Sequence, residues 1–308
     1  MIHSVSLLRI FCCLQVFLLH YFARIHLREY MWIFYGAVPC FLLISAYLCG
    51  LKYGSGGMDK SFLIKRYKSL SSYYYPFVLG AFVFFSILNP DQILHYLHSA
   101  VLNLCYITTL TDPLPQCGHL WFMQTLAICY LGIYFLNNNF FRKLFTKGAY
   151  IAILFFICCC VGFIYRGPIT WYLFFYLLLF FNAKRIQTFI FTPHFSKNYI
   201  FLIGSIALCY SLLSIDYARL FHLGIYFRYV HTCILAILTI ILFLRLFKDI
   251  KSTPFITYSA SITMEVYLVH HLLVFDNPLY ISLPVTIILS IILHTIGSLI
   301  YNKIQIIK

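Results

Sequence analysis

Two residues in the first apolar stretch, Arg9 and His20, have the types and the spacing to do chemistry. They lie eleven positions apart, which at 100° per residue leaves about 20° after three full turns, so on a helix they share one face with about 16 Å between them. His is the side chain most often used as a general base, and an Arg within a membrane costs roughly 3 kcal/mol unless it has a partner or water. The pair indicates a functional stripe. The alternative is that Arg9 extends to the inner headgroups and His20 is a hydrogen-bonded core residue.

Glu265 is a second candidate, because it lies in the apolar stretch 255–275, where an acid is nearly as costly as an arginine. We expect Arg9 or Arg228 to be its partner. His270 follows five positions later, about 140° around a helix. Glu265 and His270 are therefore not expected to form a local dyad.

His119 is a third candidate, two residues before Trp121 at the expected outer end of the apolar segment 119–136. A histidine beside an interfacial tryptophan is also an ordinary feature of membrane helices. A catalytic and an interfacial role therefore both stay open for His119. His270 and His271 are as compatible with a structural role as with a catalytic one.

The stretches that must position these residues are long and apolar. Of the 308 residues, 62% are hydrophobic and 10% are charged, against about 25% charged in an average soluble domain. This balance excludes a disordered chain, a collagen-like fibre and a disulfide-stapled secreted domain, and the continuous apolar runs exclude a transmembrane β-barrel. We predict an all-α, polytopic membrane protein with about ten transmembrane helices, at residues 5–22, 32–51, 72–88, 119–136, 149–165, 169–183, 198–214, 229–247, 255–275 and 283–301. A less apolar helix within 92–110 is expected to lie at the outer interface or to re-enter the membrane.

The net charge of +14 is mainly a topology signal and calls for no nucleic-acid partner. With the N-terminus inside, every Lys falls on the predicted inner side, and most acidic residues fall outside. The basic residues on the inner side are Lys52, Lys60, Lys65, Arg66, Lys68, Arg142, Lys143, Lys147, Lys184, Arg185, Lys197, Arg245, Lys248, Lys251, Lys303 and Lys308. Both termini are therefore predicted to be cytoplasmic. We expect a single membrane-embedded domain over residues 1–308, with no fused soluble domain.

Four fragments, in one order along nearly the whole chain, resemble a known family. They are Arg9 with His20, the stretch 38–50, Leu120-Trp121-Phe122, and Tyr267-Leu268-Val269-His270. The integral-membrane acyltransferases of family three, which O-acylate bacterial surface polysaccharides, are similar: they carry an Arg and a His separated by ten residues, a Phe-Phe-x-x-Ser-Gly-Phe type second helix, a Leu-Trp-Phe motif and a Tyr-Leu-x-His ending. Two departures are Ala46, where the family usually has Gly, and Lys65 with Lys68, where the family has Arg-x-x-Arg.

The resemblance implies a multi-pass O-acyltransferase, with O-acetyl the expected group, in the bacterial cytoplasmic (inner) membrane. It implies acetyl-CoA, or another acyl-CoA, as the donor on the cytoplasmic side, and a hydroxyl of a cell-surface polysaccharide or of its lipid-linked precursor as the acceptor. On this chain His20 would be the base that activates the hydroxyl, and Arg9 would hold a donor phosphate or carbonyl. Glu265 and His119 complete the expected catalytic set.

The basic cluster of Lys65, Arg66 and Lys68 would hold the phosphates of coenzyme A. Its other interpretation is a stop-transfer cluster, because the other predicted inner loops are basic too. The sequence has no Gly-rich phosphate loop and no metal-ligand spacing. No metal is therefore expected.

Two other classes of membrane protein compete with the acyltransferase: a lipid-linked oligosaccharide polymerase or flippase, and a small-molecule transporter. Internal repeats would favour a transporter, but the interruption at Gly167-Pro168 has no counterpart in another half of the chain. A polymerase would be expected to have a large basic outer loop, whereas the predicted outer loop 89–118 contains no Lys or Arg. The acyltransferase explains Arg9, His20 and the ordered motifs together.

Overall fold

The computed structural model describes most of the chain as helix. The described residues are 2–27, 31, 34–54, 58–108, 112–165, 169–192, 199, 202–206, 224–251, 253–274 and 278–306. No strand occurs among them, which confirms the predicted all-α class. The chain divides into two compact units: unit 1 holds residues 1–58 and 131–260, and unit 2 holds residues 59–130 and 261–308. The single membrane-embedded domain stays a prediction.

Unit 1 is organised around its second helix, which packs against α1, α8 and α10. The helices of this unit are α1 (Ile2–Arg24), α2 (Ala37–Tyr53), α6 (Asn139–Thr146), α7 (Gly148–Tyr165), α8 (Ile169–Phe191) and α10 (Gly224–Leu246). At Gly50 the backbones of α2 and α8 come into direct contact, because a Cβ there would lie 2.2 Å from the carbonyl oxygen of Phe180. Small residues permit this close packing of helices in membranes.

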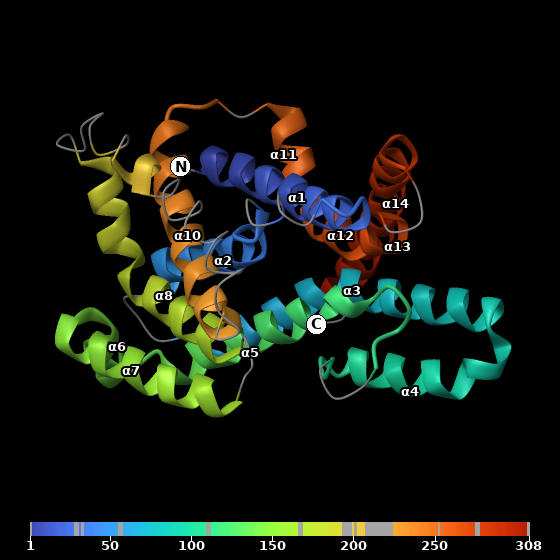
Figure 1. The fold of residues 1–308 in the computed structure, drawn as a ribbon, viewed down its shortest axis with the longest axis horizontal. Coiled ribbons are helices and arrows are strands. Elements are labelled where there is room, and N and C mark those ends of the chain that lie inside the picture. Colours follow the sequence, from blue (N-terminus) through green and yellow to red (C-terminus); the bar gives the residue numbers. More distant parts are fainter. Residues whose placement is uncertain are drawn as a thin grey trace. The chain divides into compact units, whose positions relative to one another are not determined.

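Unit 2 is organised around a long helix, α3, which packs along α14 and α4 (Figure 1). Its elements are α3 (Lys60–Leu88), η2 (Pro90–Gln92), α4 (Ile93–Leu104), η3 (Gly118–Leu120), α12 (Thr263–Val269), α13 (His271–Val274) and α14 (Leu279–Ile306). The short helix α12 lies against both α14 and α3. Two further helices, α5 (Trp121–Leu136) and α11 (Pro254–Ser261), have residues in both units.

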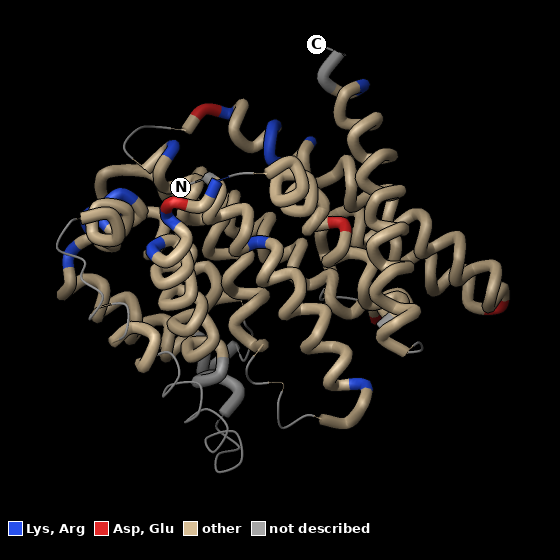
Figure 2. The backbone as a smooth tube through the Cα atoms, turned by 90° about the horizontal axis from the view of Figure 1, so that it is seen from above, with Lys and Arg blue, Asp and Glu red and all other residues tan. Residues whose placement is uncertain are grey.

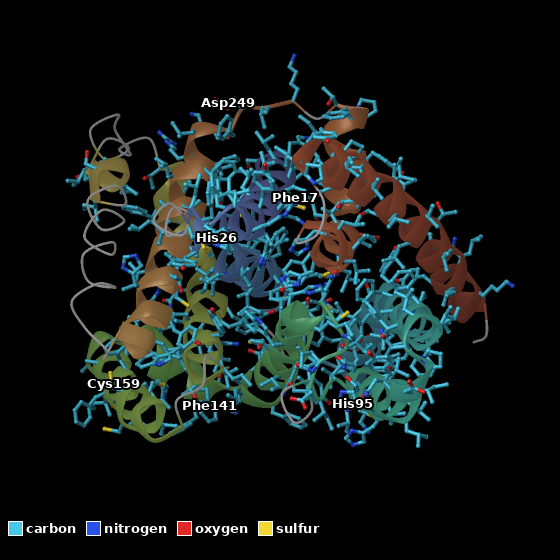
Figure 3. All side chains as sticks on the ribbon, turned by 45° about the vertical axis from the view of Figure 1, so that its right-hand side comes forward. Phe17, His26, His95, Phe141, Cys159 and Asp249 are labelled. Carbon is cyan, nitrogen blue, oxygen red and sulfur yellow. The ribbon has the colours of Figure 1, made fainter. Side chains whose placement is uncertain are left out.

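Helix α4 runs antiparallel to α3. Near the end of α3 the rings of Phe85 and Tyr96 lie 6.4 Å apart, and further back along α3 the rings of Tyr74 and Tyr106 lie 5.0 Å apart. A buried hydrogen bond also joins the two helices: the Tyr74 hydroxyl donates to Oδ1 of Asn103 at 3.1 Å. His95 points away from α3 (Figure 3). The predicted helix within 92–110 is confirmed, and its place in the bilayer stays a prediction.

Six helices of the described chain are long and apolar enough to cross a bilayer. They are His3–Arg24, Lys60–Leu88, Gly118–Leu136, Ile169–Phe191, Tyr229–Leu246 and Leu279–Ile304. A seventh arises if α6 and α7, which are bent by 92°, count as one span. The predicted spans 32–51 and 255–275 correspond to the shorter α2 and to the successive helices α11, α12 and α13, and most of 198–214 lies outside the described residues. Ten spans and cytoplasmic termini stay predictions.

The distribution of side chains on these helices suits a lipid environment. Acidic and basic residues lie mostly at helix ends and in connections, with few along the helices (Figure 2). Large apolar side chains on the outer faces of α3, α4 and α14 are exposed, for example Leu79, Leu94 and Leu299. In water such apolar faces would be unfavourable, whereas lipid chains solvate them.

Candidate active site

The structure confirms that Arg9 and His20 lie on one continuous helix, α1. Both side chains are partly exposed. Leu8, Cys12 and Val16 of the same helix are buried (0%, 0% and 1% exposed), and Phe17 points into the side-chain interior in Figure 3. The shared face predicted from the eleven-residue spacing therefore holds, and it is the packed side of α1, because Val16 lies within about 40° of both Arg9 and His20 around the helix.

His119 is buried, at 4% exposure. It lies in the 3₁₀ turn η3 that leads into α5. Its Nε2–H donates to the carbonyl of Leu268 at 3.0 Å, and its own carbonyl accepts from the Tyr267 hydroxyl at 2.9 Å. Its ring lies 6.3 Å from that of Phe77, eleven residues before the end of α3 at Leu88, which corresponds to about 16 Å of helix. His119 thus lies beside the middle of α3.

His270 and His271 join His119 in a cluster of imidazoles. The His119 ring centroid lies 4.4 Å from that of His271 and 5.3 Å from that of His270. Nδ1–H of His270 donates to the carbonyl of Tyr267 at 2.7 Å, and Nδ1–H of His271 donates to the carbonyl of Gln116 at 2.9 Å. In neutral His270 and His271 these bonds leave Nε2 as the nitrogen that can accept a proton, whereas in neutral His119, whose Nε2–H donates, it is Nδ1.

The break between α12 and α13 has a local cause. The carbonyls of Tyr267 and Leu268, in the last turn of α12, receive the bonds from His270 and His119. The chain turns at His270 and resumes in α13, where the amide of Leu273 bonds back to the His270 carbonyl at 3.2 Å. Gln116 adopts a left-handed backbone with φ of 56°, a conformation that costs about 1 kcal/mol or more outside glycine. The carbonyl of Gln116 accepts the hydrogen bond from Nδ1–H of His271.

Glu265 has a partner that the sequence did not lead us to expect. Its side chain is 1% exposed, and its Oε1 lies 2.5 Å from Nδ1 of His294 on α14. The His294 ring stacks on Tyr73 of α3, with centroids 5.6 Å apart and planes inclined by 8°. The expected pairing with Arg9 or Arg228 stays a prediction, and the side chain of Arg228 lies outside the described residues.

A free thiol lies close in sequence to His119. Cys117 is 1% exposed, and burial raises the pKa of its thiol to about 12. The thiol therefore stays protonated at neutral pH, and a protonated thiol is a poor nucleophile. Cys117 is not a candidate to carry an acyl group.

Comparison with known protein families now decides the class of the protein. Residues 2–303 match the model of a family described as an acyltransferase domain. The chain belongs to acyltransferase family 3. No curated protein and no solved structure matches it. The match runs from the first turn of α1 to the last turns of α14, so both units of the acyltransferase lie within it.

The basic cluster of the acyltransferase is helical and not a loop, because α3 begins at Lys60 instead of near residue 72. Asp59 caps the helix: its Oδ1 accepts from the amide of Phe62 at 3.2 Å and from the Ser61 hydroxyl at 2.6 Å. The Ser61 hydrogen bond, followed by the amide of Phe62 and the charge of Lys65, holds the pKa of Asp59 below its usual value. Such a cap stabilises the first turn.

The three basic residues of the cluster, Lys65, Arg66 and Lys68, differ in their exposure and in their contacts. Lys65 is exposed, whereas the Arg66 guanidinium lies 5.6 Å from the Phe62 ring centroid and 5.4 Å from that of Tyr130. Nζ of Lys68 donates to the carbonyl of Ile304 at 3.3 Å, near the end of α14. A cation there stabilises the helix terminus. Arg66 and Lys68 thus have structural contacts in addition to their expected phosphate role.

The structure of the acyltransferase brings together some of the predicted site residues and adds others. It places His119 with His270 and His271, and it places Glu265 on the same short helix that holds His119. His294 and Tyr73 were missed. A polar residue inside the apolar run 283–301 is itself a signal of function, and that signal would have identified His294.

Proposed function

We propose that this acyltransferase moves an acetyl group from cytoplasmic acetyl-CoA to a hydroxyl of a cell-surface polysaccharide or its lipid-linked precursor, in the bacterial inner membrane. The observation that carries the proposal is the stripe of Arg9 and His20 on α1 of a chain that belongs to the acyltransferase family. When a hydroxyl attacks a thioester, a base takes the proton of the hydroxyl and a cation holds the donor. His20 and Arg9 supply these two groups from one face of α1.

In the proposed reaction, His20 accepts the proton of the acceptor hydroxyl while its oxygen attacks the thioester carbonyl. The carbon–sulfur bond of the tetrahedral intermediate then breaks. The thiolate of coenzyme A leaves and takes the proton from the His20 imidazolium, so that the products are the ester and free coenzyme A. Arg9 binds a donor phosphate or the carbonyl oxygen, because a guanidinium offers a planar pair of N–H donors.

The buried groups of unit 2 have supporting roles in this proposal. His119 is the second candidate for proton transfer, and its ring is held by Leu268 and by the His271 ring beside it. Glu265 is the acidic residue among the proposed catalytic residues. Lys65, Arg66 and Lys68 contribute binding of the phosphates of coenzyme A, with exposed Lys65 the most accessible of the three.

The test is transfer by the purified protein. The acyltransferase in liposomes is given acetyl-CoA labelled in the acetyl group and a panel of bacterial surface glycans, and both ester-linked label and released thiol are measured. We expect one thiol per ester formed, and ester label removed by mild alkali. Thiol release without ester on any glycan, or no turnover of acetyl-CoA, would contradict the proposal.

A further inference from the structure

The Glu265–His294 pair is an acid–base contact within unit 2 whose carboxylate is almost fully enclosed. Oε1 of Glu265 and Nδ1 of His294 lie 2.5 Å apart, which is hydrogen-bond contact. Glu265 is 1% exposed, and the side chain of His294 is 22% exposed. The two residues come from helices α12 and α14, 29 positions apart in the chain.

The His294 ring is itself held in place. Tyr73 of α3 stacks on it almost parallel, at 5.6 Å and 8°. Gly297, one turn further along α14, makes this possible, because a Cβ at that position would lie 2.1 Å from Cδ1 of Tyr73. The Tyr73 hydroxyl also lies 3.5 Å from Oγ of Ser298. Three helices therefore fix the orientation of one imidazole.

The pair is connected to the His119 cluster through α12. Glu265 lies three residues before Leu268, whose carbonyl holds the His119 ring, and two before Tyr267, whose hydroxyl holds the His119 backbone. A change in the position of Glu265 is therefore transmitted along one short helix of seven residues to His119. Apolar side chains of similar volume often replace both members of a buried pair without loss of stability, so a role of the pair beyond stability can be tested.

We propose that His294 is a positioning residue of the acyltransferase: through its Nδ1–Oε1 contact it holds the Glu265 carboxylate, and with it α12, in the arrangement that acyl transfer requires. The inference rests on the proposed function. His294 acts through Glu265, so its effect depends on the carboxylate being present.

The test is a set of variants in the labelled acetyl-transfer assay, normalised to the amount of protein in the membrane. His294→Leu removes the donor and is expected to lower kcat about 10- to 100-fold, with the KM for acetyl-CoA unchanged. His294→Asn places a side-chain N–H close to the position of Nδ1 and is expected to recover most of kcat. His294→Gln places its N–H near the position of Nε2 and is expected not to. The matched control is His95→Leu on α4, an exposed histidine, which is expected to keep the wild-type kcat.

A double-mutant cycle separates positioning from general support of the fold. Glu265→Gln is expected to lower kcat, and adding His294→Leu to it is expected to lower kcat by less than twofold more, because the partner through which His294 acts is already gone. Wild-type kcat in His294→Leu, equal rescue by Asn and Gln, or full additivity in the double variant would overturn the inference. An inactive wild-type protein would instead contradict the proposed function.

Discussion

The two units hold their candidate groups in different ways. In unit 1, Arg9 and His20 are partly exposed and belong to one helix. In unit 2, His119, Glu265 and His270 are at most 4% exposed, and each is hydrogen-bonded to a group from its own or another element. Partly exposed groups on one helix are placed to meet substrates, whereas buried groups that bond to neighbouring elements are suited to hold those elements in place. We therefore expect substitutions of Arg9 and His20 to act on chemistry, and substitutions of the buried groups of unit 2 to act through geometry.

The largest effect is expected at His20. His20→Gln keeps the size and the hydrogen-bonding capacity but cannot accept a proton at neutral pH, so kcat is expected to fall about 10²- to 10⁴-fold, while the amount of protein in the membrane stays normal. Initial rates of labelled acetyl transfer measure this. His98→Gln on α4, where the histidine is exposed, is the control. A His20→Gln enzyme with near wild-type rate would remove His20 as the base and move that role to His119.

A smaller effect is expected at the two close helix contacts, one in each unit. Gly50→Ala would place a Cβ 2.2 Å from the Phe180 carbonyl oxygen, and Gly297→Ala would place one 2.1 Å from Tyr73. Overpacking of this kind costs about 1–3 kcal/mol. Thermal unfolding in detergent is expected to show both losses, and Gly297→Ala is expected also to lower kcat because the displaced Tyr73 ring supports His294. Gly80→Ala, where a Cβ meets nothing within 4 Å, is the control. Equal kcat for both destabilised variants would break the distinction between the units.

The smallest effects are expected in the basic cluster. Lys65→Gln is expected to raise the KM for acetyl-CoA about fivefold without changing the unfolding temperature, because Lys65 is exposed and acts by charge. Lys68→Gln is expected to lower the stability of unit 2 by about 1 kcal/mol, since it loses the bond to Ile304. Measuring KM and unfolding for both variants checks this division. An unchanged KM in Lys65→Gln would leave the cluster as a topology signal.

The features that follow from local periodicity could be predicted from the sequence. The helix that carries Arg9 and His20 is one of these, because helical spacing alone puts both residues on one face. The same holds for the all-α class, since long apolar runs can satisfy their backbone in a membrane only as helices. The predicted break in regular structure before residue 72 was wrong: basic residues are good helix formers, and with the Asp59 cap they extend α3 to Lys60.

The contacts between distant segments could not be predicted. His119 and Leu268 are 149 residues apart in the chain, and His271 and Gln116 are 155 apart. Neither helical periodicity nor composition contains information on such pairs. His294, the partner of Glu265, is a different case, because a polar residue inside the apolar run 283–301 is itself a signal that the sequence contains.

If this acyltransferase esterifies a surface glycan as proposed, the mass of that glycan in cells depends on the gene. Surface polysaccharide is purified from a strain lacking the gene and from the same strain carrying it, and both are analysed by mass spectrometry before and after mild alkali. We expect an alkali-labile mass increase of one acetyl group per modified sugar only in the strain that carries the gene. Identical glycan masses in the two strains would contradict it.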